Sequence, residues 1–186
     1  ENMMEAEKGA PANIAANRHV LFLGRFTQEK GVHLLAEAAK RADVPVRFVG
    51  DGPMKDEIAQ INPAADIRPW VAADKVFDEY RQARALVSPS IWFETGPMTA
   101  PEAMACGVPA IVARDMGAAG WVHDGRDGLV IPPGDVEALA LALRRMASGE
   151  AVAMGQAAYA NYWAEPFTLA RHVGRLRGVY RTLAKA

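Results

Sequence analysis

Apolar residues along this chain follow two alternating patterns. Short, largely apolar runs predict strands that are buried on both faces of a sheet, at 20–23, 46–49, 85–87, 110–113 and 128–131. The segment 66–71 is a further candidate strand, but it carries two charges and has Pro69 inside it. Apolar residues three or four positions apart predict amphipathic helices, at 31–40, 54–60, 74–83, 101–105, 135–146, 151–163 and 168–184. Asp74 and Asp135 stand where a side chain can cap the helix that follows.

Strands that alternate with helices indicate a parallel sheet covered by helices on both faces. We therefore predict an α/β, Rossmann-like domain with a sheet of about six strands. Parallel sheets of this kind bind ligands at the carboxyl ends of their strands, in the loops that open the next helices. Chemistry is accordingly expected in the loops after Leu23, Val49, Val71 and Val87.

One domain accounts for most of the 186 residues. Residues 1–17 are polar, rich in alanine and without a clear period, so we expect a linker or disordered lead-in there and the domain over 18–186. The hydrophobic share of 51% excludes a chain that is disordered throughout. The irregular start favours a piece of a longer protein.

Charge and cysteine content narrow the class of partner. A net charge of -1 with scattered basic residues gives no reason to expect nucleic acid. Cys106 is the single cysteine, so no internal disulfide can form, and a reducing compartment is the simpler expectation. No apolar run approaches the length of a membrane span, and residues 1–8 lack a secretory pattern.

A strand-to-helix loop, Gly24-Arg25-Phe26-Thr27-Gln28-Glu29-Lys30-Gly31, carries the first candidate chemistry. Gly24 permits a tight turn, and the helix start near Gly31 presents N–H groups that suit a phosphate. Arg25 offers a planar fork of donors and Lys30 a mobile charge, a pair that suits a diphosphate. The alternative is that both are ordinary solvated charges.

Two carboxylates eight positions apart, Glu94 and Glu102, flank the second candidate segment. Carboxylates accept hydrogen bonds from sugar hydroxyls, and the tight loop at 96–98 is expected to turn its main chain toward a sugar or a phosphate. The alternative for Glu102 is structural, since an acid in the first turn favours a helix. The small residues at 103–110 suit close packing on the sheet, and Cys106 is expected to be a buried hydrophobe rather than a catalytic thiol.

Together these segments resemble the retaining glycosyltransferases of family GT4 (glycosyl transferases group 1), and more narrowly the C-terminal Rossmann-like domain of their GT-B fold. The resemblance covers residues 20–146 and rests on Gly24-Arg25, Lys30-Gly31, Ser88-Pro89-Ser90, Glu94 and Glu102 with seven residues between them, and Glu-Ala-Met-Ala-Cys-Gly-Val-Pro at 102–109. Asp124-Gly125-Arg126-Asp127-Gly128-Leu129-Val130, Pro132 and Asp135 also fit the family pattern.

The resemblance implies roles for the matching residues. Arg25 and Lys30 would hold the diphosphate of a nucleotide-sugar and stabilise the leaving group, with no metal or other cofactor. Glu94 would contact the transferred sugar, and these three are the expected catalytic residues. Glu102 would bind the ribose hydroxyls. The other donor-binding residues would act through the main chain, with Val71 at the base and Gly24, Gly96, Pro97, Met98 and Thr99 at the phosphates and the sugar.

The family also implies a hexosyltransferase (EC 2.4) that keeps the anomeric configuration of its donor. We expect a UDP-sugar in preference to a GDP-sugar, and the sugar and acceptor are left open. Relatives bind the acceptor on an N-terminal domain for which this chain has no room, so the domain alone is expected to be inactive. The full-length protein is expected in the cytoplasm, with a peripheral position at the inner membrane as the alternative.

In two-domain relatives the last helix often crosses back to the N-terminal domain. Without that partner, we expect its apolar stripe to support a dimer, through Leu169, His172, Val173, Leu176, Val179, Tyr180 and Leu183.

Three departures from the family stand out. Gly96-Pro97-Met98 replaces the Phe-Gly-Leu of many relatives, which we interpret as a subgroup with the same tight loop. Gly120, followed by Trp121, stands where relatives have the glutamate of a Gly-Gly-x-Pro-Glu segment. The histidines are scattered and are expected to be structural or solvent-facing, at His19, His33, His123 and His172.

Two other functions fit the same residues. A non-catalytic nucleotide-sugar-binding module that acts with a separate partner chain would also retain Arg25, Lys30, Glu94 and Glu102. A sugar-nucleotide epimerase or a phosphorylase of the GT-B fold is the third interpretation, and the spacing of Glu94 and Glu102 argues against most of these.

Overall fold

Six parallel strands form one sheet in the computed structural model of this chain, which describes residues 6–183. The strands are β1 (Val20–Leu23), β2 (Val46–Val49), β3 (Asp66–Arg68), β4 (Ala85–Ser88), β5 (Ala110–Ala113) and β6 (Gly128–Ile131). Their order is β3-β2-β1-β4-β5-β6, and every neighbouring pair is parallel. The predicted α/β, Rossmann-like fold is therefore confirmed. The order reverses direction between β1 and β4, the place where such sheets open a ligand crevice.

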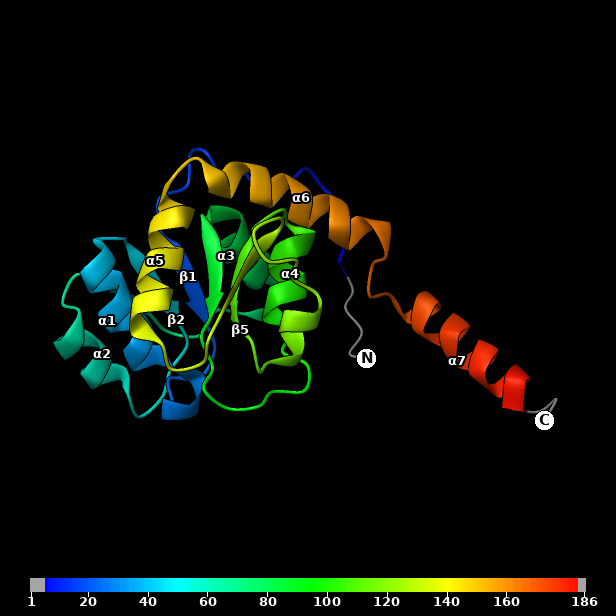
Figure 1. The fold of residues 1–186 in the computed structure, drawn as a ribbon, viewed down its shortest axis with the longest axis horizontal. Helices are drawn as coiled ribbons and strands as arrows, with labels where there is room; N and C mark the ends of the chain where they lie inside the picture. Colours follow the sequence, from blue (N-terminus) through cyan, green and yellow to red (C-terminus); the bar gives the residue numbers. More distant parts are fainter. Residues whose placement is uncertain (1–5, 184–186) are drawn as a thin grey trace.

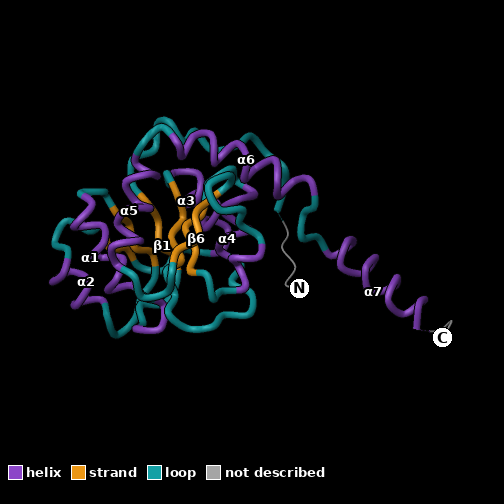
Figure 2. Tube along the Cα trace, in the orientation of Figure 1, coloured by secondary structure: helices purple, strands orange, loops and turns teal. Residues whose placement is uncertain are grey.

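Helices cover both faces of the sheet (Figure 1). On one face, α1 (Val32–Ala42) packs against α2 (Lys55–Ile61) and α5 (Val136–Ala147), and on the other face α3 (Val76–Gln82) packs against α4 (Thr99–Ala105). Helix α6 (Glu150–Ala164) contacts both α5 and α4, so it crosses from one face to the other, along the top of Figure 1. Helix α7 (Leu169–Leu183) extends away from the rest, as the tube in Figure 2 also shows.

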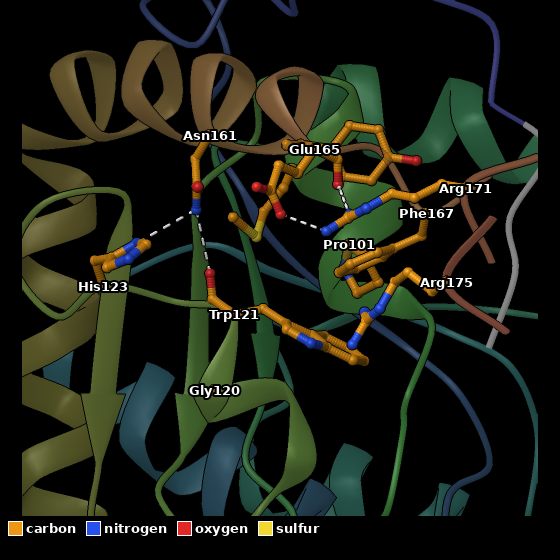
Figure 3. Close-up of a pocket in the computed structure, with 11 residues that line it drawn as sticks. Pro101, Gly120, Trp121, His123, Asn161, Glu165, Phe167, Arg171 and Arg175 are labelled. Atoms are coloured by element: carbon orange, nitrogen blue, oxygen red, sulfur yellow. Dashed lines mark hydrogen bonds and ion pairs between the residues drawn. The ribbon is translucent and has the colours of Figure 1, made fainter. Parts of the chain in front are cut away.

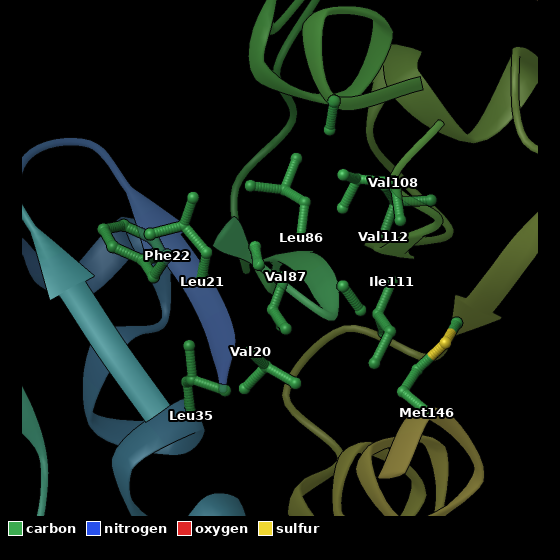
Figure 4. Close-up of a cluster of buried hydrophobic side chains, with 14 of the residues drawn as sticks. Val20, Leu21, Phe22, Leu35, Leu86, Val87, Val108, Ile111, Val112 and Met146 are labelled. Atoms are coloured by element: carbon green, nitrogen blue, oxygen red, sulfur yellow. The ribbon is translucent and has the colours of Figure 1, made fainter. Parts of the chain in front are cut away.

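The central strands β1, β4 and β5 are short and largely apolar because helices bury both of their faces, whereas the edge strand β3 has no buried residue. Successive side chains point to opposite faces, so in Figure 4 Val20 and Ile111 lie on the side of Met146 from α5, while Leu86 and Val112 lie on the other side. Each of these five side chains is at most 1% exposed. Within residues 6–183, no helix is long and apolar enough to cross a membrane.

Two element boundaries that lie near a proline differ from the sequence prediction. Strand β3 ends at Arg68. The next residue, Pro69, has no backbone N–H and so cannot donate a hydrogen bond to a neighbouring strand. Helix α4 begins at Thr99, two residues earlier than expected. Pro101 is tolerated there because it lies in the first turn, where a backbone N–H has no partner within the helix.

The two expected helix caps have different outcomes. Asp135 does cap α5, since its Oδ1 accepts a hydrogen bond from the backbone N–H of Ala138 at 2.9 Å. The cap expected at Asp74 is wrong. A 3-10 turn, η2 (Ala73–Lys75), precedes α3 and contains Asp74, so the chain already coils before the α-helix begins and no side chain caps it.

Residues 6–17, expected to be a linker, contain no helix or strand but pack on the domain. Ile14 is 4% exposed and belongs to the hydrophobic core. The N–H of Ala12 donates to the carbonyl of Cys106 at 2.8 Å, and the Asn17 side chain donates to the carbonyl of Ala83 at 2.8 Å. This segment therefore covers the ends of β4 and α4.

The terminal helix α7 exposes much of its apolar stripe. Leu169, Leu176 and Tyr180 are exposed, while His172 and Val173 are half-buried. The side chains of Val179 and Leu183, also counted in the stripe, lie outside the described residues.

Candidate functional site

Two loops meet at the carboxyl ends of β1 and β4, where the strand order of the sheet reverses. The loop after β1 passes through the 3-10 turn η1 (Gln28–Lys30) into α1, and the loop after β4 runs from Pro89 to α4. Because α1 and α4 cover opposite faces, the two loops part above the sheet and leave a crevice between them. The residues predicted for phosphate and sugar binding come from these two loops.

Backbone contacts lock the two loops together. The backbone N–H of Ile91 and the hydroxyl of Ser90 both donate to the carbonyl of Glu29, at 2.9 and 2.7 Å. Gly31 has φ +68, and a Cβ there would lie 2.3 Å from the carbonyl oxygen of Pro89. Only glycine allows both this backbone conformation and this close approach. The relative position of the two loops is therefore set by the main chain, before any ligand enters.

A cavity of about 470 Å³ opens between these loops and is lined by Arg25, Glu29, Lys30, Trp92 and Glu94. The Lys30 ammonium donates to Glu94 Oε2 at 2.6 Å, and the two side chains are only 25% and 18% exposed. Glu94 Oε1 is buried and has no hydrogen-bond partner among the described residues. The cavity thus combines two cations with a carboxylate oxygen that can still accept a hydrogen bond.

The loop after β4 is held at its far end by a second close approach. The N–H of Gly117 donates to the carbonyl of Glu94 at 2.7 Å. A Cβ on Gly117 would lie 2.4 Å from the carbonyl oxygen of Thr95. Gly117 begins the 3-10 turn η3 (Gly117–Gly120), which lies in the segment that departs from the family's Gly-Gly-x-Pro-Glu. The first residue of this turn thus supports the backbone of Glu94.

Glu102 lies on α4, outside the lining of this cavity. The hydroxyl of Tyr80, on α3, donates to Glu102 Oε2 at 2.7 Å. Burial raises the pKa of the Glu102 carboxyl, and the hydrogen bond from Tyr80 acts in the opposite direction. The sequence analysis gave Tyr80 no role beyond its place in the helix predicted at 74–83.

The structure distributes the remaining predicted residues along the same edge of the sheet. Val71 is half-buried in the loop that follows β3, and the segment 96–98 leads, half-buried, into α4 at Thr99. Sequence reasoning also missed Glu29 and Trp92. The apolar triplet 91–93, directly before Glu94 in a loop, was the available signal for Trp92, which is 69% exposed at the cavity.

A second cavity of about 270 Å³ lies at the junction of α6 and α7 (Figure 3). Trp121, Phe167 and Arg171 are among its lining residues. At its edge His123 Nδ1 lies 2.7 Å from Asp127 Oδ2, and the buried Asp127 carboxylate also accepts a hydrogen bond from the His123 backbone N–H. These bonds close the turn before β6, so the interaction of His123 is structural.

Burial also shifts the pKa values of Cys106 and His19, two side chains that the sequence analysis expected to have no catalytic role. Burial raises the pKa of the Cys106 thiol to about 11, which disfavours the reactive thiolate. Burial and the nearby Arg47 cation lower the pKa of His19 to about 4, so this imidazole is neutral at physiological pH. Within residues 6–183, no group of three or more His, Cys, Asp or Glu side chains is arranged to hold a metal ion.

A doubly wound parallel sheet with a charged cavity at its switch point defines a Rossmann-like ligand-binding domain. The chain belongs to the family of glycosyl transferases group 1, since the sequence model of that family matches residues 17–148. The expected resemblance to the C-terminal domain of a GT-B fold is confirmed by relatives and by solved structures.

Three known proteins illustrate the similarity. The GDP-mannose-dependent alpha-mannosyltransferase of Corynebacterium glutamicum is 33% identical over 116 residues, which cover 62% of this chain and 28% of that protein. The structure of sucrose-phosphate synthase from Thermosynechococcus elongatus matches 92% of this chain and 46% of its own, with a TM-score of 0.78 at 26% identity. HepE of Anabaena in complex with UDP-glucose matches 93% of this chain and 50% of its own, with a TM-score of 0.74 at 21% identity. The chain thus spans half or less of the length of these three proteins.

Proposed function

We propose that this chain is the donor-binding domain of a retaining glycosyltransferase that transfers a sugar from a UDP-sugar to an acceptor. The observation that carries the proposal is that Arg25, Lys30 and Glu94 line the same cavity, at the switch point between β1 and β4. Two cations suit the two phosphates of a nucleotide-sugar, and the unpartnered Glu94 Oε1 suits a sugar hydroxyl. HepE, which shares the fold, forms a complex with UDP-glucose, whereas the similar mannosyltransferase of Corynebacterium glutamicum is GDP-mannose-dependent, so the choice of uridine is tested against guanosine below.

Binding of the donor requires an exchange of partners at Lys30. In the free protein its ammonium is paired with Glu94. In the proposed complex the diphosphate lies between Arg25 and Lys30, and Glu94 is released toward the sugar. When the bond between the anomeric carbon and the phosphate oxygen breaks, negative charge grows on the diphosphate, and the two fixed cations stabilise it without a metal.

The other predicted residues complete the proposed donor site. Glu102 would bind the ribose hydroxyls, the main chain over 96–99 would contact the sugar and phosphates, and the loop at Val71 would hold the base. The acceptor would bind to a second domain of the kind that the GT-B fold provides. The chain alone is therefore expected to bind donor without transferring the sugar.

Calorimetric titration with UDP, GDP, ADP and UDP-glucose tests the proposal. Arg25→Ala should weaken UDP binding by about 1.5–3 kcal/mol, because a charge-assisted contact to phosphate is lost. Arg126→Ala is the matched control, since Arg126 is exposed in the turn before β6, at the opposite end of the sheet. A folded protein that binds none of the four nucleotides, or equal binding by both variants, would rule out this assignment of the cavity.

We also propose that the isolated chain dimerises through α7, on the basis of the exposed apolar side chains of Leu169, Leu176 and Tyr180. Sedimentation velocity over a wide concentration range tests this. A Leu176→Glu variant should shift the protein toward the monomer, because a charge would be buried in the interface. A wild-type chain that stays monomeric throughout would contradict it.

A further inference from the structure

Glu102 is a partly buried carboxylate with an incomplete set of partners. Among the residues that the structure describes, the Tyr80 hydroxyl is the one hydrogen-bond donor to its side chain, and no lysine, arginine or histidine forms an ion pair with it. A shielded carboxylate is normally stabilised by a cation or by several donors. A single neutral hydroxyl leaves room for further donors on Oε1 and on the second lone pair of Oε2.

Glu79, the shielded acid that precedes Tyr80 on α3, does have a cation beside it. Its carboxylate accepts a hydrogen bond from Arg47 at 3.0 Å, and the two side chains are each 11% exposed. Glu102 lies on the neighbouring helix and has no such cation. The hydrogen bond from Tyr80 therefore leaves acceptor sites on Glu102 that the donors of a ligand can fill.

The packing around Tyr80 fixes the position of its hydroxyl group. Its ring is fully buried and packs edge-on against Phe77, with ring centroids 6.0 Å apart. Burial and the nearby Glu102 carboxylate raise the pKa of the Tyr80 hydroxyl well above its usual value. The phenol therefore remains protonated and always presents its proton to Glu102.

The hydrogen bond also joins two parts of the expected donor site. Helix α3 follows the loop that contains Val71, on the side predicted for the base. Helix α4 carries Glu102 and follows the loop that contains Glu94. The bond between Tyr80 and Glu102 is the point where a side chain of α3 reaches the predicted ribose-binding carboxylate.

We propose that Tyr80 is a positioning residue, which orients the Glu102 carboxylate so that its remaining acceptor sites meet the ribose hydroxyls of a nucleoside diphosphate. This inference rests on the proposed donor-binding function. Tyr80 touches no part of the ligand itself. Its effect is confined to the ribose, so binding of the diphosphate should not depend on it.

Titrations with UDP, 2′-deoxy-UDP and inorganic pyrophosphate separate these contributions. Tyr80→Phe should weaken UDP binding about 3- to 10-fold, the effect of one lost hydrogen bond to a charged group. It should bring the affinities for UDP and 2′-deoxy-UDP closer together and leave pyrophosphate binding unchanged. Glu102→Gln should abolish the same preference, which links the two residues.

Tyr159→Phe is the matched control, because it removes a hydroxyl that donates to the Gly9 carbonyl, away from α3. It should leave the UDP to 2′-deoxy-UDP preference at the wild-type value. A second readout is pH. Loss of the Tyr80 hydrogen bond raises the pKa of Glu102, so as pH falls the preference for UDP should disappear at a higher pH in Tyr80→Phe than in the wild type.

The outcomes separate the inference from the function on which it rests. If wild-type protein binds UDP and Glu102→Gln loses the ribose preference, but Tyr80→Phe retains it, then the role of Tyr80 is wrong and donor binding stands. If folded wild-type protein binds neither UDP nor pyrophosphate, the proposed function and this inference are both overturned.

Discussion

The ammonium of Lys30 and the carboxylate of Glu94 meet at 2.6 Å across 64 positions of sequence. One follows β1 and the other follows β4, so the pair spans the switch point of the sheet. Both side chains are largely shielded from water, which strengthens their attraction. An anion that enters the cavity must therefore compete with Glu94 for Lys30.

Removing this competing charge should strengthen nucleotide binding. Glu94→Gln keeps the size of the side chain. We expect UDP to bind about 2- to 10-fold more tightly, since no ion pair between Lys30 and a carboxylate has to be broken when UDP binds. Any additional affinity for UDP-glucose over UDP should be lost, because the sugar loses its charged acceptor. Calorimetry with both ligands measures these effects. Glu57→Gln, exposed on α2, serves as the control, and weaker UDP binding by Glu94→Gln would contradict the exchange at Lys30.

The close approach at Gly31 should make this glycine irreplaceable. Gly31 and Gly125 both have positive φ, at +68 and +75, but only Gly31 faces a backbone oxygen where a Cβ would lie. Gly125→Ala should cost about 1 kcal/mol of unfolding free energy, the strain of a left-handed alanine. Gly31→Ala carries the same strain and a clash with Pro89, so its cost should be larger by about 2 kcal/mol or more. Urea denaturation measures both, and equal losses would contradict the clash.

Arg84 should stabilise the domain through buried carbonyl groups. Arg84 is 7% exposed. Its guanidinium donates hydrogen bonds to the carbonyl oxygens of Met146, Ile14, Asn17 and Ser148. It thereby ties the end of α5 to the N-terminal segment. Arg84→Met should lower the unfolding free energy by about 2–4 kcal/mol, because these acceptors lose their donors inside the protein. Arg126→Met, at an exposed position, should change it by less than about 0.5 kcal/mol.

His19 should make the domain less stable in acid. Its pKa is about 4 in the folded protein against 6.5 in the unfolded chain, so the unfolded chain binds the proton more tightly between these values. The contribution to stability is complete above pH 6.5 and is lost as pH falls toward 4. This linkage amounts to about 3 kcal/mol at most. His19→Gln should flatten the decline of unfolding free energy over this range, and an unchanged slope would contradict the low pKa.

The fold was predictable because its evidence is local. The segments 20–23, 46–49 and 110–113 became strands with the same bounds, since four largely apolar residues between turns fit a sheet buried on both faces. The errors were also local in origin. Asp74 has the chemistry of a cap, but the 3-10 turn that contains it already coils the chain.

The site was predictable only in its residue types. Arg25, Lys30 and Glu94 were expected near one ligand, and they do line one cavity. The pairing of Lys30 with Glu94 and the contribution of Trp92 were not foreseen. Both depend on how the loop after β4 folds back over the loop after β1, and that arrangement depends on the backbone contacts of Glu29.

The sequence by itself determined the family and the succession of strands and helices along the chain, because periodicity and motif spacing are properties of neighbouring residues. Tertiary structure alone decided which polar groups share a partner. Tyr80 and Glu102 belong to different helices and are joined only because both pack on the same face of the sheet. Such contacts depend on the strand order, which no local pattern specifies.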